Sequence, residues 1–137
     1  MIKSNKIPRS WDQLVRLKKF LSYADGKKLR LPEDELYYRL HLKLVPKKVL
    51  VEIIKRQING RSICLLKNNH PYTRILKYLP EVEHYCLWSK KGRLSETKIN
   101  KYLNRVLKKR KSWFFMERLE NAKSIPEIWH CHVFLKR

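Results

Sequence analysis

The sequence predicts an α+β fold in which N-terminal helices pack with a small, mainly antiparallel sheet containing a strand-helix-strand-strand unit. Three observations lead to this prediction. Apolar residues recur at helical spacing through residues 10–58, they alternate with polar residues in two later segments, and a basic amphipathic helix lies between those segments. The 137 residues are expected to form a single domain, with a helical half at about 1–60 and a sheet-containing half at about 61–137.

The first half of the chain is predicted to begin with two helices. Ser10 and Gln13 have the spacing of a capping box, and the apolar pattern after them predicts a helix that ends at about Ser22, before residues 24–26. Pro32 is followed directly by three acidic residues, which suit the first turn of a second helix. The apolar stripe of this second helix is expected to consist of Leu36, Leu40 and Leu44.

A third helix is predicted to begin at Pro46 and to end at Asn59-Gly60. Its buried face is expected to consist of Leu50, Ile53, Ile54 and Ile58. The chain then changes character: Ser62–Leu66 is predicted to form a short strand, Lys67–Tyr72 a loop, and Thr73–Leu79 a short helical stretch.

The second half is predicted to contain the main sheet. Strands are expected at Val82–Ser89, Ser112–Met116 and Ile128–Leu135, because apolar and polar residues alternate there or aromatic residues are dense. Ser95 is expected to cap a long helix that ends at about Arg110. The last two strands can pair as a hairpin, and the helix can cover one face of the same sheet.

The charge of the chain indicates a polyanionic partner. With 33 Lys and Arg against 12 Asp and Glu, the net charge is +21, and repulsion of this size opposes a compact state. Nucleic acid is the usual partner of such a chain, whereas an anionic membrane, an acidic protein or a merely soluble surface are the alternatives. The residues expected to contact phosphates form the densest basic group, which no acidic residue interrupts: Lys98, Lys101, Arg105, Lys108, Lys109, Arg110 and Lys111.

Several classes of protein are excluded by what the sequence lacks. No apolar run approaches the ~18–20 residues of a transmembrane helix, and the basic N-terminal segment is unlike a secretory signal. We therefore expect an intracellular protein, in the cytoplasm, the nucleus or a virion, with three reduced cysteines. The sequence has no phosphate-binding Gly-rich loop, dinucleotide fingerprint or nucleophile elbow, so no cofactor is expected. It also has no helix-turn-helix or zinc finger, so RNA and single strands are as well supported as duplex DNA.

Four segments resemble one known family. They are the Asn-x-x-Pro-Tyr loop at Asn68–Tyr72, the strand Glu83–Lys90, the turn Lys123–Pro126 and the strand His130–Phe134. Together they resemble the fungal N-acetylglucosamine-induced protein family, an uncharacterised conserved domain with homologues in large DNA viruses. The family usually has an acidic residue where this chain has Asn69. The resemblance implies a fold and the position of a site, and it implies no assigned activity.

A candidate site is predicted where histidines recur in phase. His130 and His132 must share one face of their strand, and His84 can join that face if the two strands are neighbours. With the nearby loop they are expected to form a pocket for a phosphate or a base, whose residues are Asn68, Asn69, Tyr72, His84, Trp88, Lys90, His130 and His132.

Catalysis, metal binding and a purely structural role are the other interpretations of these histidines. His84, His130 or His132 can serve phosphoryl or nucleotidyl transfer, one as nucleophile and another as acid or base. No metal site is expected, because Cys131 points away from its two histidine neighbours and no Cys-x-x-Cys is present. The histidines can also be core residues that only stabilise the sheet.

The leading hypothesis is a basic nucleic-acid-binding protein with a histidine-bearing pocket on the sheet. The first alternative is an enzyme that acts on a nucleotide or sugar phosphate through the His-x-His strand. The second is an interaction protein that binds an acidic partner or a packaged viral genome. Binding is favoured over catalysis, and the sequence leaves the oligomeric state open.

Overall fold

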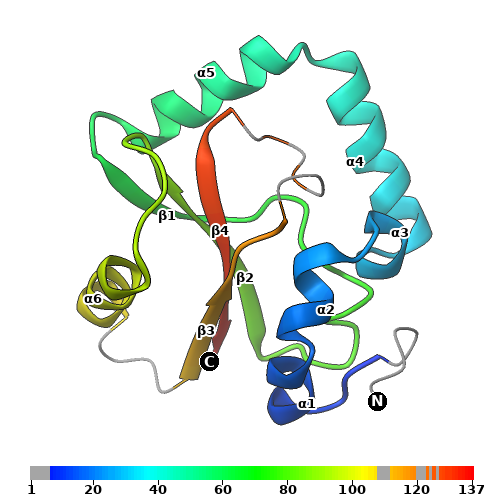
Figure 1. Cartoon of the computed structure of the whole chain (residues 1–137). Helices are drawn as coiled ribbons and strands as arrows, with labels where there is room; N and C mark the ends of the chain where they lie inside the picture. Colours follow the sequence, from blue (N-terminus) through cyan, green and yellow to red (C-terminus); the bar gives the residue numbers. More distant parts are fainter. Residues whose placement is uncertain (1–6, 108–111, 120–122, 124, 126) are drawn as a thin grey trace.

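The computed structural model describes residues 7–107, 112–119, 123, 125 and 127–137 (Figure 1). It confirms the predicted α+β class, with helices around a four-stranded antiparallel sheet. In chain order the elements are α1 (Trp11–Arg16), α2 (Lys18–Tyr23), α3 (Gly26–Leu29), α4 (Pro32–Leu44), α5 (Lys47–Ile58), β1 (Ile63–Lys67), β2 (Val82–Ser89), α6 (Glu96–Val106), β3 (Ser112–Met116) and β4 (Trp129–Lys136).

The first predicted helix is divided in two. Ser10 caps α1 as expected, because its side chain accepts a hydrogen bond from the Gln13 backbone N–H. The helix is interrupted at Leu17, and α2 continues to Tyr23. Asp25 begins a further helix and does not mark a simple end, since its side chain accepts from the Lys27 N–H at the start of α3. This short helix was not predicted from the sequence, because it follows α2 after only two residues.

The second predicted helix starts where the sequence indicates, but it faces the other way. Pro32 begins α4, whereas the leucine stripe expected to be buried is exposed at Leu36, Leu40 and Leu44. The buried residue of α4 is instead Glu35, which pairs with Arg30. The charged pair therefore decides which side of α4 faces the rest of the protein.

Two smaller expectations are also corrected. Ile53 on α5 is largely exposed, although its neighbours Leu50, Ile54 and Ile58 are buried as predicted. Residues 73–78 form turns and no helix, and the N–H groups of Arg74 and Ile75 both donate to the Leu29 carbonyl at the end of α3.

The sheet has the strand order β1-β2-β4-β3. The predicted hairpin of β3 and β4 is confirmed, and β4 lies between β2 and β3. The helix expected to cover one face does so: α6 and the N-terminal helices lie on opposite sides of the sheet (Figure 1). The end predicted for this helix, at Arg110, lies outside the described residues, and α6 ends at Val106.

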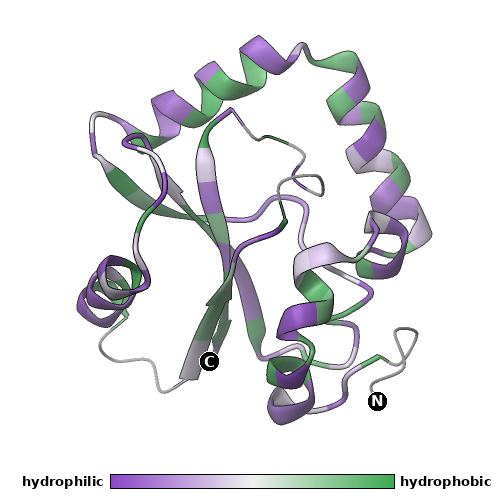
Figure 2. Ribbon diagram, in the orientation of Figure 1, coloured by the Kyte–Doolittle hydropathy of each residue, from purple (hydrophilic) through white to green (hydrophobic). Residues whose placement is uncertain are grey.

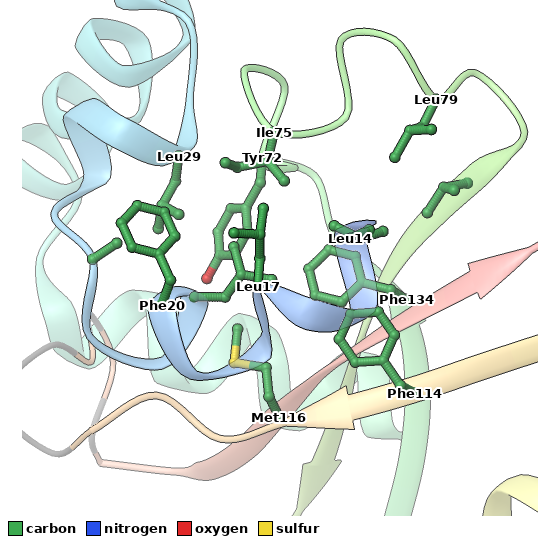
Figure 3. Packing of buried hydrophobic residues seen from close by; sticks show 13 residues of the cluster. Leu14, Leu17, Phe20, Leu29, Tyr72, Ile75, Leu79, Phe114, Met116 and Phe134 are labelled. Carbon is green, nitrogen blue, oxygen red and sulfur yellow. The ribbon is translucent and has the colours of Figure 1, made fainter. Parts of the chain in front are cut away.

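Alternation along β4 gives each face its own core. Cys131, Val133 and Leu135 pack under α6 with Ile99 and Leu103. On the other face Phe134 lies among buried residues of α1 to α3 and of the segment after Tyr72 (Figure 3). Hydrophobic residues follow the sheet strands closely, while purple and green alternate along α4 and α5 (Figure 2).

Helices α4 and α5 form an arch from α3 to β1 above this second face (Figure 1). The far end of the arch is held by Ile54 and Ile58, which pack against Cys86, Trp88 and Ile128. The near end is held by polar contacts, including the Thr73 hydroxyl that donates to Asp34 at 2.7 Å. None of the described helices is both long and apolar enough to cross a membrane.

Candidate functional site

The structure places the three predicted histidines on one face of the sheet. β2 and β4 are neighbours, and their register sets Cys86 opposite His132 and Trp88 opposite His130. His84 lies close enough to His132 for a hydrogen bond, with 2.8 Å between Nε2 and Nδ1. The alternation in the sequence was sufficient to predict this shared face.

A chain of hydrogen bonds fixes the tautomers of His84 and His132. The Tyr72 backbone N–H can only donate, and it lies 3.3 Å from His84 Nδ1. His84 therefore carries its proton on Nε2 and donates it to His132 Nδ1. His132 in turn holds its proton on Nε2 and donates to the Tyr72 hydroxyl oxygen at 3.3 Å. This arrangement satisfies both imidazoles in their neutral form.

Burial keeps these two histidines neutral. It lowers the pKa of His84 and of His132 well below the usual 6.5, and the nearby Arg30 guanidinium adds to the effect on both. His130 also lowers the pKa of both, and His84 lowers that of His132, since a second positive charge in this space is unfavourable.

His130 differs from its neighbours because one of its ring nitrogens remains an acceptor. Nδ1 lies 3.3 Å from the Ile128 carbonyl oxygen, which can only accept, so the proton is on Nδ1 and Nε2 has a lone pair. The ring packs against Trp88, with 4.2 Å between ring centroids. Burial lowers the pKa of His130 to about 4, so the imidazole is neutral near pH 7.

These side chains border a cavity of about 490 Å³ between the sheet face and the arch of α4 and α5. Its volume is within the range of pockets that hold small molecules. Of the residues that the structure describes, four cationic side chains and four of the five histidines line it, and no carboxylate does. The cations and histidines are Arg30, Lys67, Arg118, Lys123, His41, His70, His130 and His132.

Arg30 links the cavity to the arch. Its guanidinium pairs with Glu35 at 3.1 Å, and its Nε donates to the His70 carbonyl at 2.9 Å. The same group lies 4.1 Å from the centre of the Tyr38 ring and 5.3 Å from that of Tyr72. One buried side chain therefore positions α4 and the loop before Tyr72 together.

One end of the cavity is aromatic. His70 from the loop lies among three rings of α4, with centroid distances of 5.7 Å to Tyr37, 4.7 Å to Tyr38 and 5.3 Å to His41. All four residues line the cavity. Flat rings of this kind can stack on a base, which gives this end a different chemistry from the cationic side chains.

A second group of charges lies after β3. Lys123 is nearly buried, and its ammonium donates to Glu117 at 2.8 Å. Arg118 donates to the Leu21 carbonyl at 2.8 Å. Both residues line the cavity, and each has a partner elsewhere in the fold.

The predicted pocket residues are mostly brought together. Asn68, Asn69, Tyr72, Trp88, His130 and His132 line the cavity, and His84 lies behind His132 and Asn68. Lys90 does not line it, because β2 ends before that residue and its N–H donates to the Ser62 carbonyl.

The predicted basic face has a separate location. Lys98, Lys101 and Arg105 are exposed on α6, across the sheet from the cavity, whereas Lys108, Lys109, Arg110 and Lys111 lie outside the described residues. Among the ion pairs of the described chain, none involves the three exposed residues on α6.

Most residues that line the cavity were not predicted from the sequence. Arg30, Arg118 and Lys123 are single cations among 33, and no local pattern distinguishes them. The histidines were the signal in the sequence that could have indicated the remaining part of the cavity. All five of them, including His41 and His70, lie at or beside it.

The hydrogen bonds of the site bear on whether it suits a metal. His84, Cys86 and His132 have potential ligand atoms within 4.8 Å of one another. A metal-binding histidine normally donates its second N–H to an acceptor, whereas the second nitrogen of His84 faces the Tyr72 N–H donor. Burial also raises the pKa of Cys86 to about 12. These groups fit a hydrogen-bonded network better than a ligand set.

Comparison with known proteins supports the family resemblance. No family model matches the chain. The chain is 27% identical over 169 residues to N-acetylglucosamine-induced protein 1 of Candida albicans, an alignment that covers 99% of this chain and 65% of that protein. The resemblance to that fungal protein is thereby confirmed, while the viral relationship stays a prediction. The chain spans less than two thirds of the length of this curated relative.

A solved structure shares the fold. The crystal structure of HTC1 superposes with a TM-score of 0.59 and 18% sequence identity, covering 93% of this chain and 84% of that chain. At this identity the similarity concerns the arrangement of helices and strands alone.

Proposed function

We propose that the protein binds nucleic acid, with phosphates held on its exposed basic surface and one nucleotide unit received in the cavity. The observation that carries this proposal is the lining of the cavity. It combines cations, histidines and aromatic rings, and among the described residues no carboxylate lines it. The cations can donate hydrogen bonds to a phosphate, and the rings offer a base a stacking surface.

The two parts of the proposal use different sides of the sheet. Lys98 and Lys101 on α6 are exposed and supply positive charge without acidic neighbours in contact. Their contacts would be with the backbone, which makes binding dependent on salt and tolerant of sequence. The cavity supplies the selective contact, through Asn68, Asn69 and the aromatic rings.

Fluorescence anisotropy with labelled single-stranded RNA, single-stranded DNA and duplex DNA, from ~50 to 200 mM salt, tests the backbone contacts. A protein that neutralises ~6 phosphates gives a log–log slope near −5 on duplex. We expect the double variant Lys98→Glu with Lys101→Glu to reduce the steepness of that slope by about 2 and to weaken binding at least about tenfold. The matched control is Lys77→Glu with Lys136→Glu, which makes the same charge change at other exposed positions and should do less. Equal losses in both variants, or no binding at ~50 mM salt, would contradict the backbone part of the proposal.

A second candidate function is an enzyme that acts on a nucleotide or sugar phosphate. The specific observation in its favour is His130, whose neutral ring keeps a lone pair on Nε2 beside a cation-lined cavity. Such a nitrogen can accept a proton from a water or a hydroxyl, or attack a phosphoryl group.

This candidate predicts turnover that depends on His130. Incubation with a panel of nucleotides and sugar phosphates, followed by ³¹P NMR, should show a new phosphorus signal. His130→Gln should lower the rate at least about 100-fold, because general acid or base catalysis contributes that much. Lys136→Gln is the control and should leave the rate unchanged. If ligands bind in the cavity without any change in their phosphorus spectrum over a day, binding alone is the function.

A further inference from the structure

The outer face of α4 is apolar and uncovered. Leu36, Leu40 and Leu44 are 62%, 45% and 75% exposed, and Tyr37 beside them is 66% exposed. Residues four apart lie above one another on a helix, so the three leucines form a continuous stripe. An apolar stripe of this kind on a soluble domain marks an interaction surface.

The charge of α4 distinguishes it from the other described helices. It contains three acidic residues, Glu33, Asp34 and Glu35, and two basic ones, Arg39 and Lys43, for a net charge of −1. The other described helices carry between 0 and +3, counted in the same way. An anionic membrane or an acidic protein would therefore be attracted to other surfaces of this chain and not to α4.

We infer that the outer face of α4 binds a second copy of this chain, with the two α4 helices packed antiparallel so that Leu36 lies against Leu40 of the partner subunit. The acids of α4 lie in its first turn and Lys43 in its last. Antiparallel packing brings Glu33 of one protomer near Lys43 of the partner subunit, and it also opposes the two helix dipoles. The helix is thus complementary to itself in this orientation.

The inferred dimer uses a different side of α4 from most of the cavity lining. Tyr37, Tyr38, His41 and Leu42 line the cavity from α4, whereas the three leucines do not, and Tyr37 lies at the border of the two surfaces. A second copy would support α4 from outside, where few contacts hold it now. This inference does not depend on the proposed nucleic-acid binding. One helical stripe is a small interface, so we expect a dissociation constant of the order of micromolar.

Sedimentation equilibrium of nucleic-acid-free protein over a range of concentrations tests the dimer. We expect a monomer–dimer equilibrium that Leu40→Glu weakens on the order of 100-fold, because it places a carboxylate at the centre of the interface. The matched control is Val106→Glu on α6, a residue exposed to 44% that should leave the equilibrium unchanged. Circular dichroism confirms that each variant is folded. The inference is overturned if the wild-type chain stays monomeric, or if Leu40→Glu does not weaken its dimer. If a monomeric wild-type chain binds anionic vesicles, the stripe is a membrane-binding surface instead.

A charge exchange tests the orientation. Glu33→Lys and Lys43→Glu should each weaken self-association, because each places like charges together in a homodimer. An equimolar mixture of the two variants should form a heterodimer with both contacts restored. The double variant Glu33→Lys with Lys43→Glu should also dimerise, because antiparallel packing again sets opposite charges together. Parallel packing would set like charges together in the double variant, as it does in the single variants. If neither the mixture nor the double variant regains association, antiparallel packing is wrong.

Discussion

Replacing Arg30 by alanine is expected to lower the free energy of unfolding by about 3–5 kcal/mol, the usual cost of removing one partner of a buried ion pair. The side chains of Arg30 and Glu35 are each only 8% exposed, so the variant leaves a carboxylate buried with one remaining partner, Arg39. It also removes the donor to the His70 carbonyl. Urea denaturation followed by circular dichroism measures the change.

Arg39, the other partner of Glu35, provides the control for this prediction. Arg39 pairs with Glu35 at 2.7 Å, but its side chain is 59% exposed. Arg39→Ala should therefore cost less than about 1 kcal/mol, because solvent replaces an exposed partner well. If Arg30→Ala and Arg39→Ala cost the same, burial of the pair does not determine its contribution. Since Arg30 positions both α4 and the loop, we also expect its loss to weaken any ligand of the cavity under conditions where the variant stays folded.

Acid is expected to unfold the protein in a range set by three histidines. In the unfolded chain each imidazole has a pKa near 6.5, whereas burial holds the pKa of His130 at about 4 and those of His84 and His132 well below 6.5. The unfolded state therefore takes up protons first as the pH falls. The stabilisation is complete above pH 6.5 and is lost as the pH decreases from 6.5 toward the pKa values of the folded state.

The size of this effect follows from linkage. Each histidine contributes about 1.4 kcal/mol per pH unit within that range, so three contribute about 4 kcal/mol per unit. Between pH 7 and pH 5 the free energy of unfolding should fall by roughly 5 kcal/mol, as measured by urea denaturation at half-unit intervals. His130→Gln keeps a donor for the Ile128 carbonyl and should remove about a third of the slope. A stability that stays level between pH 7 and pH 5 would show that these imidazoles titrate freely in the folded protein.

The parts of the fold that could be predicted from the sequence are those in which the signal is local. Pro32 and the acids after it set the start of α4, and alternation set the strands and the shared face of His130 and His132. Periodicity shows which side of a helix is apolar, but it does not show that anything packs there. The leucines of α4 were therefore expected in the core, whereas the Arg30–Glu35 pair turns that side outward.

The cavity could be predicted only in part for the same reason. Its sheet side comes from two strands whose patterns are clear, and its loop side from the Asn-x-x-Pro-Tyr segment. The cations are brought in by contacts between residues far apart in sequence, such as Arg30 with the His70 carbonyl and Arg118 with the Leu21 carbonyl. Thr73–Leu79 was expected to be helical because its own sequence permits it, whereas residues 73–78 form turns that the N–H groups of Arg74 and Ile75 connect to the Leu29 carbonyl. No local pattern contains such information.

The position of β4 between β2 and β3 constrains the order in which the protein can form during synthesis. Both neighbours are made before it, and neither pairs with the other in the completed sheet. While the ribosome is still translating residues 129–136, β3 has no strand to pair with and the histidine face is only half built. The helices and the β1–β2 pair can form as they emerge, but the cavity cannot be assembled until β4 has left the exit tunnel. Until β4 emerges, the apolar residues of β3 lack the strand with which they pair in the finished sheet.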